Sequence, residues 1–195
     1  METTKDRILN ATAELFRRYG YTGTGMKQIV RQAEAPFGSI YHFFPGGKEQ
    51  LGKDVIRRSG QMYEDLFETI IGSAPDVLTG IENFFIGAAE VLRQSDYADA
   101  CPIATVALEV ASTSEPLREA TADVFESWIE AVTVRLVAAG APQSQARELA
   151  ILAIVSLEGA FILCRATRST EAMDVASAAT MQALRSALPT MAASA

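Results

Sequence analysis

The sequence predicts an all-α protein of about nine helices, on three observations. Apolar residues recur at the three- and four-residue spacing of a helix in almost every segment, and few runs alternate as strands do. Proline, glycine and short polar breaks divide these segments into lengths typical of helices. The 195 residues are 49% apolar and 21% charged, which is enough to bury a substantial core and argues against disorder.

The first three helices are short and closely spaced. The first is expected over Asp6–Tyr19, with Thr3 and Asp6 as a capping box and Gly20 as a stop. Thr24 is expected to cap the second, over residues 25–33. A break at residues 34–36 leads to the third, over residues 37–44, which a proline and two glycines end. Two short helices joined by such a break and braced by another form a helix-turn-helix motif.

Six further helices are expected beyond this motif. Pro102 marks the start of the third of them, and Ser114 as a cap and Gly140 as an end mark the fourth. The expected ranges are 48–71, 76–94, 101–112, 115–139, 144–167 and 171–188.

Charge is distributed unevenly along the chain. Residues 1–60 hold ten basic and six acidic residues, whereas residues 61–195 hold seven and eighteen, and all four lysines lie in the first part. The local field matters more than the overall charge of -7 for binding a polyanion. The sequence therefore predicts a basic domain over residues 1–58 and an acidic one over 59–195, with the boundary inside the fourth helix.

Several functional classes lack support. One histidine and two distant cysteines, Cys101 and Cys164, provide neither a metal-ligand spacing nor a disulfide framework, so no metal or cofactor is expected. No catalytic triad or glycine-rich phosphate loop is recognisable, which argues against an enzyme. No signal segment is visible, and the apolar stretch 149–164 is shorter than the roughly 20 residues that a spanning helix needs. We expect a soluble, cytoplasmic protein.

The third helix has two different faces. Its inner face is centred on Ile40, with Pro36, Phe43 and Phe44 within about 60° of it. The outward arc is small or hydrogen-bonding, which suits close approach to a DNA groove; it holds Gly38, Ser39, Tyr41 and His42. Phe37 lies at the border, where its ring packs sideways or touches a thymine methyl.

At these residues the chain resembles the TetR family of bacterial transcriptional repressors. The matching run is residues 24–51, and its specific part is Gly38-Ser-Ile-Tyr-His-Phe-Phe followed by Lys48-Glu-Gln-Leu. Residues 45–48, Pro-Gly-Gly-Lys, and residues 101–109 resemble the LmrA/YxaF-type branch. The strong resemblance covers about residues 5–58. The chain departs from the common pattern at residues 34–37, where Glu-Ala-Pro-Phe replaces a Gly-Val-Ser turn and a following lysine.

The resemblance implies roles in binding operator DNA. Thr24 would cap the second helix and contact a phosphate through its hydroxyl. Tyr41 and His42 would bind phosphates at the end of the recognition helix, and Lys48, with the free amides that begin the fourth helix, would hold another. Phe37, Gly38 and Ser39 would lie nearest the base edges, and Lys27 and Gln28 would reach the groove wall.

These residues also have structural interpretations. Tyr41 and His42 would form a half-buried aromatic pair, Thr24 a plain cap, and Gly38 a close helix contact. The arginines at positions 17, 18, 57 and 58 would be solvated charges.

The acidic part carries aromatic residues at helical spacing, which are more typical of a core than of a binding site. A ligand-responsive domain nonetheless needs an apolar cavity with a few polar groups. Glu109, inside an apolar run, is a candidate polar group, or alternatively a charge on an exposed stripe. The apolar candidates are Met62, Phe84, Phe85, Phe125 and Trp128.

The last two helices are predicted to form a dimer interface. The stretch 149–164 is apolar nearly all round, and small residues along both helices permit close packing. Glu158 would then need a partner, Arg165 or Arg168 of the other chain; the alternative is a helix packed deeply within the monomer. The interface candidates are Leu149, Leu152, Val155, Glu158, Gly159, Ile162, Met181 and Leu184.

The sequence thus predicts an N-terminal helix-turn-helix three-helix domain and a C-terminal helical domain for ligand binding and dimerisation. The expected function is a repressor that binds a palindromic operator as a homodimer and is released by a small amphipathic effector. The alternative is an all-helical small-molecule-binding or protein-interaction module without DNA activity.

Overall fold

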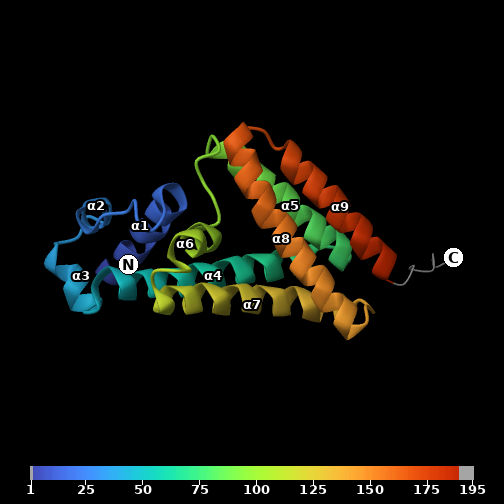
Figure 1. Cartoon of the computed structure of the whole chain (residues 1–195), viewed down its shortest axis with the longest axis horizontal. Helices are drawn as coiled ribbons and strands as arrows, with labels where there is room; N and C mark the ends of the chain where they lie inside the picture. Colours follow the sequence, from blue (N-terminus) through green and yellow to red (C-terminus); the bar gives the residue numbers. More distant parts are fainter. Residues whose placement is uncertain (1, 189–195) are drawn as a thin grey trace. The chain divides into compact units, whose positions relative to one another are not determined.

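The computed structural model describes residues 2–188, and this part of the chain forms nine α-helices and no strand (Figure 1). The all-α prediction is confirmed, and each expected helix end lies within two residues of the observed one. The helices are α1 (Thr4–Tyr19), α2 (Met26–Gln32), α3 (Gly38–Phe43), α4 (Gly47–Ser73), α5 (Val77–Gln94), α6 (Pro102–Val110), α7 (Glu115–Ala138), α8 (Gln143–Thr167) and α9 (Glu171–Ala187).

The chain divides into two compact units. The first joins the residues up to Tyr63 with Ala98–Phe125, and the second joins Glu64–Tyr97 with the residues from Glu126 onward. Helices α4 and α7 each begin in the first unit and end in the second. Helix α6 therefore belongs with the three N-terminal helices. The predicted boundary between residues 58 and 59 separates a DNA-binding domain from a ligand-binding domain. The division into compact units does not test it, so it stays a prediction.

Local signals explain the N-terminal helices. The Thr3 hydroxyl accepts a hydrogen bond from the Asp6 amide at 3.1 Å, and the Asp6 carboxylate accepts one from the Thr3 amide at 3.3 Å, which is the expected capping box. Gly20 ends α1 at a φ of 72°, in the region that favours glycine. The first unit has a core of fully buried side chains, among them Ile8, Phe16, Ile29, Ile40, Phe44, Leu51 and Leu117.

Helices α4 and α7 run side by side in the same direction (Figure 1). In the first unit, Gly52 lies against Leu117 and Gly60 lies against Val124. In the second unit, Ser127 donates a hydrogen bond to Glu64, and Arg135 pairs with Glu68.

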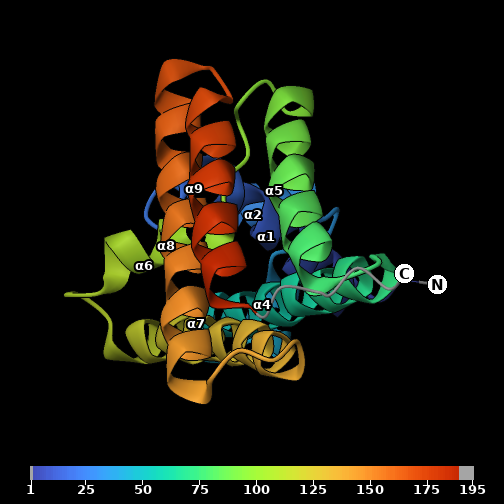
Figure 2. The same cartoon turned by 90° about the vertical axis from the view of Figure 1, so that its right-hand side faces the viewer.

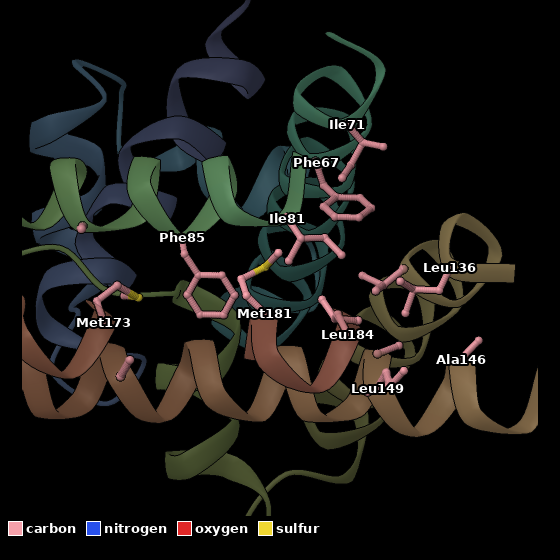
Figure 3. Close-up of a cluster of buried hydrophobic side chains, with 14 of the residues drawn as sticks. Phe67, Ile71, Ile81, Phe85, Leu136, Ala146, Leu149, Met173, Met181 and Leu184 are labelled. Carbon is pink, nitrogen blue, oxygen red and sulfur yellow. The ribbon is translucent and has the colours of Figure 1, made fainter. Parts of the chain in front are cut away.

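In the second unit, α5, α8 and α9 pack side by side (Figure 2). Buried apolar residues from five helices meet in one core, which Figure 3 shows. They include Phe67 and Ile71 of α4, Ile81 and Phe85 of α5, Leu136 of α7, Leu149 of α8, and Met173, Met181 and Leu184 of α9. Burial of such side chains is the main force that holds helices together in water.

Among the described residues, α8 alone is long and apolar enough to cross a membrane by length and composition. An internal helix of a soluble protein passes the same test.

Candidate nucleic-acid interface

A residue of α1 donates hydrogen bonds to the turn between α2 and α3. The Arg7 guanidinium donates hydrogen bonds to the carbonyl of Ala33 at 3.0 Å and to that of Glu34 at 3.3 Å, and Glu34 has a φ of 48°. These carbonyls lie just beyond the C-terminal end of α2, where a cation is favourable. Arg7 thus sets the entry to α3. Sequence reasoning missed this role, because nothing local distinguishes Arg7 from an ordinary solvated arginine.

The inner and outer faces of α3 match their prediction closely. Ile40 and Phe44 are fully buried and Phe43 is half-buried. Pro36, however, is exposed. The reason is that α3 begins only at Gly38, so the helical wheel does not extend back to residue 36.

The outward arc of α3 is open to solvent. Gly38, Tyr41 and His42 are exposed, with 53% of Tyr41 accessible, and Ser39 is half-buried. A Cβ on Gly38 would meet nothing within 4 Å, so helix packing does not require that glycine. The ring of Phe37 packs edge-to-face against Tyr41, with 6.0 Å between ring centroids, which is the sideways packing considered above.

Thr24 is placed differently from its prediction. The residue that caps α2 is Gly25, and the fully buried Thr24 donates its hydroxyl to the Gly20 carbonyl at 2.7 Å. A buried hydroxyl needs a hydrogen-bond partner, and the turn after α1 supplies one four residues back. Thr24 therefore neither caps α2 nor offers its hydroxyl to a phosphate in this structure.

Lys48, in the first turn of α4, is half-buried. Its ammonium lies 4.4 Å from the centre of the Tyr21 ring, a cation–π contact. Burial lowers the pKa of Lys48, while the negative charge of Glu109 acts in the opposite direction. Just ahead of α4, the Gly46 amide donates to the Gln50 side chain at 2.8 Å, so this amide already has a partner within the chain.

Further basic residues of the first unit differ in whether they are exposed or paired. Lys27 and Arg57 are exposed, and Gln28 beside Lys27 is half-buried. The arginines at 17 and 18 both lie 3.6 Å from Asp99, and Arg58 pairs with Asp6 at 2.7 Å. Of the four arginines interpreted above as solvated charges, all but Arg57 are thus in ion pairs within the unit.

The candidate ligand residues are divided between the two units. Met62, Glu109 and Phe125 belong to the first, and Phe84, Phe85 and Trp128 belong to the second. Phe85 lies inside the second core, with Phe84 packed against it. The Glu109 carboxylate accepts hydrogen bonds from the amides of Tyr21 at 3.0 Å and Thr22 at 2.7 Å. It is therefore committed to the turn after α1, a contact that sequence spacing did not indicate.

The predicted interface residues separate into buried and exposed sets. Leu149, Met181 and Leu184 lie inside the core of their own unit, with 8%, 1% and 0% of their surface exposed. Glu158 is half-buried, and Arg165 and Arg168 contact Tyr97 and Asp96 of their own chain. Leu152, Val155, Gly159 and Ile162 are exposed on α8, beside Leu163, and Val175 is exposed on α9.

Within residues 2–188, no group of three or more histidine, cysteine, aspartate or glutamate side chains is arranged to hold a metal ion.

Two family models match the chain. Residues 8–55 match bacterial regulatory proteins of the tetR family, and residues 77–179 match the C-terminal domain of LmrA/YxaF-like transcriptional regulators. The uncharacterized regulator YxaF of Bacillus subtilis is 33% identical over 82% of this chain and 83% of its own length. The regulator LmrA of the same organism is 30% identical over 89% and 93%.

Solved structures agree on the fold. A TetR transcriptional regulator from Legionella pneumophila superposes with a TM-score of 0.84 at 23% identity, covering 93% of this chain and 97% of its own. The reduced form of the Escherichia coli protein NemR gives a TM-score of 0.81 at 24% identity, covering 97% and 98%.

Proposed function

This chain belongs to the TetR family of bacterial transcriptional regulators, and we propose that it acts as a ligand-released repressor. In this proposal a homodimer binds a palindromic operator through two copies of α3, which enter successive major grooves about 34–36 Å apart. A small amphipathic effector favours a form whose recognition helices are wrongly spaced, so that the population shifts away from DNA.

The exposed arc of α3 is the observation that carries the DNA-binding role. Gly38 leaves room at the helix start, and Tyr41 and His42 present hydrogen-bonding groups to solvent at its end. Tyr41 and His42 would contact phosphates, whereas Phe37, Gly38 and Ser39 would lie nearest the bases. Lys27, Gln28 and Lys48 would add contacts from the neighbouring helices.

Dimerisation is supported by the exposed side of α8 and α9. Leu152, Val155 and Ile162 are 41%, 63% and 55% exposed, and Val175 of α9 is 63% exposed. The exposed Gly159 between them permits close helix approach. Large apolar side chains exposed at helical spacing along one helix are typical of an interaction surface. We therefore assign the apolar character of α8 to an interface and take the protein to be soluble and cytoplasmic.

Effector binding is assigned to the helical second unit, with Phe84, Phe85 and Trp128 as candidates for the apolar lining. A thermal-shift screen with amphipathic small molecules would identify a ligand, because a compound that binds the folded state raises the unfolding temperature.

The central experiment measures binding to duplex DNA selected from random sequence by the protein itself. Affinity should fall linearly on a log–log plot as salt rises, because phosphate contacts release counterions. Tyr41→Ala should weaken binding to all duplexes by roughly 3- to 10-fold, the value of one hydrogen bond. Changing Phe37 or Ser39 should instead alter base preference.

Circular dichroism of Tyr41→Ala provides the control, since an exposed side chain should leave the fold intact. If the wild-type protein selects no sequence and binds no duplex, the alternative function holds: an all-helical ligand-binding or protein-interaction module without DNA activity.

A further inference from the structure

A carboxylate on α6 is hydrogen-bonded to the turn that leads into the helix-turn-helix. Glu109 lies near the C-terminal end of α6, and its two oxygens accept hydrogen bonds from the amides of Tyr21 and Thr22, one each. Hydrogen bonds from amides to an ionised carboxylate are stronger than neutral ones. Both partners belong to the first unit, 87 and 88 residues away in the chain.

Gly20 makes this approach possible. The backbone of Gly20 has a φ of 72° and a ψ of -177°, which a residue with a side chain rarely adopts. A Cβ there would lie 1.7 Å from one Glu109 oxygen and 2.8 Å from its carboxyl carbon. Any residue with a side chain at position 20 would therefore clash with the Glu109 carboxylate.

Tyr21 continues the contact to α4. Its backbone amide donates a hydrogen bond to Glu109, and the Lys48 ammonium lies 4.4 Å from the centre of its ring. The ring itself is fixed, because it packs edge-to-face on Phe16 at 5.6 Å and closely against Gly52. Glu109 also acts on Lys48 through its charge. A series of contacts thus runs from one carboxylate on α6 through the backbone and ring of Tyr21 to the first lysine of α4.

We infer that Glu109 is a positioning residue for operator binding, which acts through the turn at Tyr21 and Thr22 on Lys48. This role rests on the proposed function, in which Lys48 contacts a phosphate. It assigns to Glu109 a task other than contact with the effector. It also gives α6 a defined point of attachment to the DNA-binding helices of the first unit.

The sign of a mutational effect separates positioning from simple electrostatics. Removing a negative charge near a DNA-binding surface should strengthen attraction to the phosphates. If Glu109 positions the turn and Lys48, its removal should weaken binding instead. Glu109→Gln is the suitable change, because glutamine is nearly the same shape but offers only one acceptor oxygen to the two amides.

The test measures binding of wild type, Glu109→Gln and Glu119→Gln to the duplex that the wild type selects. Glu119 is an exposed glutamate on α7 of the same unit, so its variant controls for the loss of one charge. We expect Glu109→Gln to bind about tenfold more weakly, within the usual range of site-to-site coupling. Glu119→Gln should bind as the wild type does or slightly more tightly.

A double-mutant cycle with Lys48→Met tests whether Glu109 affects DNA binding through Lys48. If Glu109 acts through Lys48, Glu109→Gln should change affinity less than about twofold in the Lys48→Met background. Amide hydrogen exchange, measured without DNA, should show faster exchange at Tyr21 and Thr22 in Glu109→Gln, with protection of α1 unchanged. That pattern separates loss of the contact from general unfolding.

The inference is overturned if Glu109→Gln binds the duplex as tightly as Glu119→Gln does. It is also overturned if the tenfold loss persists in the Lys48→Met background, or if the two amides exchange as in the wild type. A wild-type protein that binds no duplex would instead contradict the proposed function, and the assigned role with it.

Discussion

Asp6 shows how one side chain links the start of α1 to the rest of the first unit. Its carboxylate accepts hydrogen bonds from the Thr3 hydroxyl at 2.6 Å and from Arg58 of α4 at 2.7 Å. These two contacts, that of Thr3 first, lower the pKa of Asp6 from 3.8 to about 2. Since the pKa is lower in the folded state, the stabilisation is complete above about pH 4. It is lost as the pH falls towards 2.

Asp6→Asn should therefore lower the melting temperature at pH 7 by roughly 1–3 °C, because an exposed pair contributes little. The difference from the wild type should shrink below about pH 4 and be mostly lost near pH 2, where about half of the folded molecules carry a protonated Asp6. Thermal unfolding followed by circular dichroism across this range measures both. Asp123→Asn, an exposed carboxylate on α7, provides the background. A difference that stays constant down to pH 2 would contradict the assignment.

At this scale the sequence predicts several features that depend on near neighbours, although it misplaces the cap of α2 by one residue. The capping box of Thr3 and Asp6, and the inward Ile40 opposite the outward Tyr41, follow from spacing within one or two turns. The contacts of Glu109 and Lys48 do not, because their partners come from other helices. Such contacts need the tertiary arrangement, which no local pattern specifies.

At the scale of helices, ends are predictable because their signals are local. Gly20 after α1 and Pro102 at the start of α6 act through backbone geometry alone. Which helices pair is a different matter. The parallel run of α4 beside α7 depends on small residues at particular points, and Gly60 is one of them, with Val124 directly against it.

Gly60→Ala should destabilise the protein, although the same change usually stabilises a helix by about 0.5–1 kcal/mol. The added Cβ would lie 2.6 Å from both γ-carbons of the buried Val124, so the two helices must separate or strain. We expect a net loss of about 1–3 kcal/mol, typical of overpacking. Urea unfolding measures it.

Val124→Ala supplies the rescue for this pair. Combined with Gly60→Ala, it removes the two γ-carbons that the new methyl would strike, so the double variant should be more stable than the sum of the single changes predicts. Strict additivity of the two free energies of unfolding would show that the contact does not set the spacing of α4 and α7.

For the whole molecule, composition predicts a basic N-terminal part and an acidic remainder, but not which sides of the helices are exposed. The basic N-terminal part and acidic remainder are visible in the residue counts alone. The buried and exposed sides of α8 cannot be told apart in the sequence, because a helix that is apolar nearly all round has no distinct apolar stripe. Only the packing of α5 and α9 shows that Leu149 faces the core, whereas Val155 and Ile162 face outward.

The outward side of α8 leads to a prediction about assembly. In the proposed dimer, a glutamate at position 155 or 162 would be buried without a partner, which is strongly unfavourable. Val155→Glu combined with Ile162→Glu should therefore convert the dimer to a 21.0 kDa monomer at micromolar concentration.

Sedimentation velocity distinguishes the two states, and both replaced side chains are exposed in the single chain, so the fold should survive. Val91→Glu is a matched control, since Val91 of α5 is 50% exposed and lies outside the α8–α9 surface. The monomer should also lose most of its affinity for a two-half-site duplex while retaining salt-dependent binding to a single half-site, because only the dimer engages both half-sites at once. A double variant that still sediments as a dimer would place the interface elsewhere.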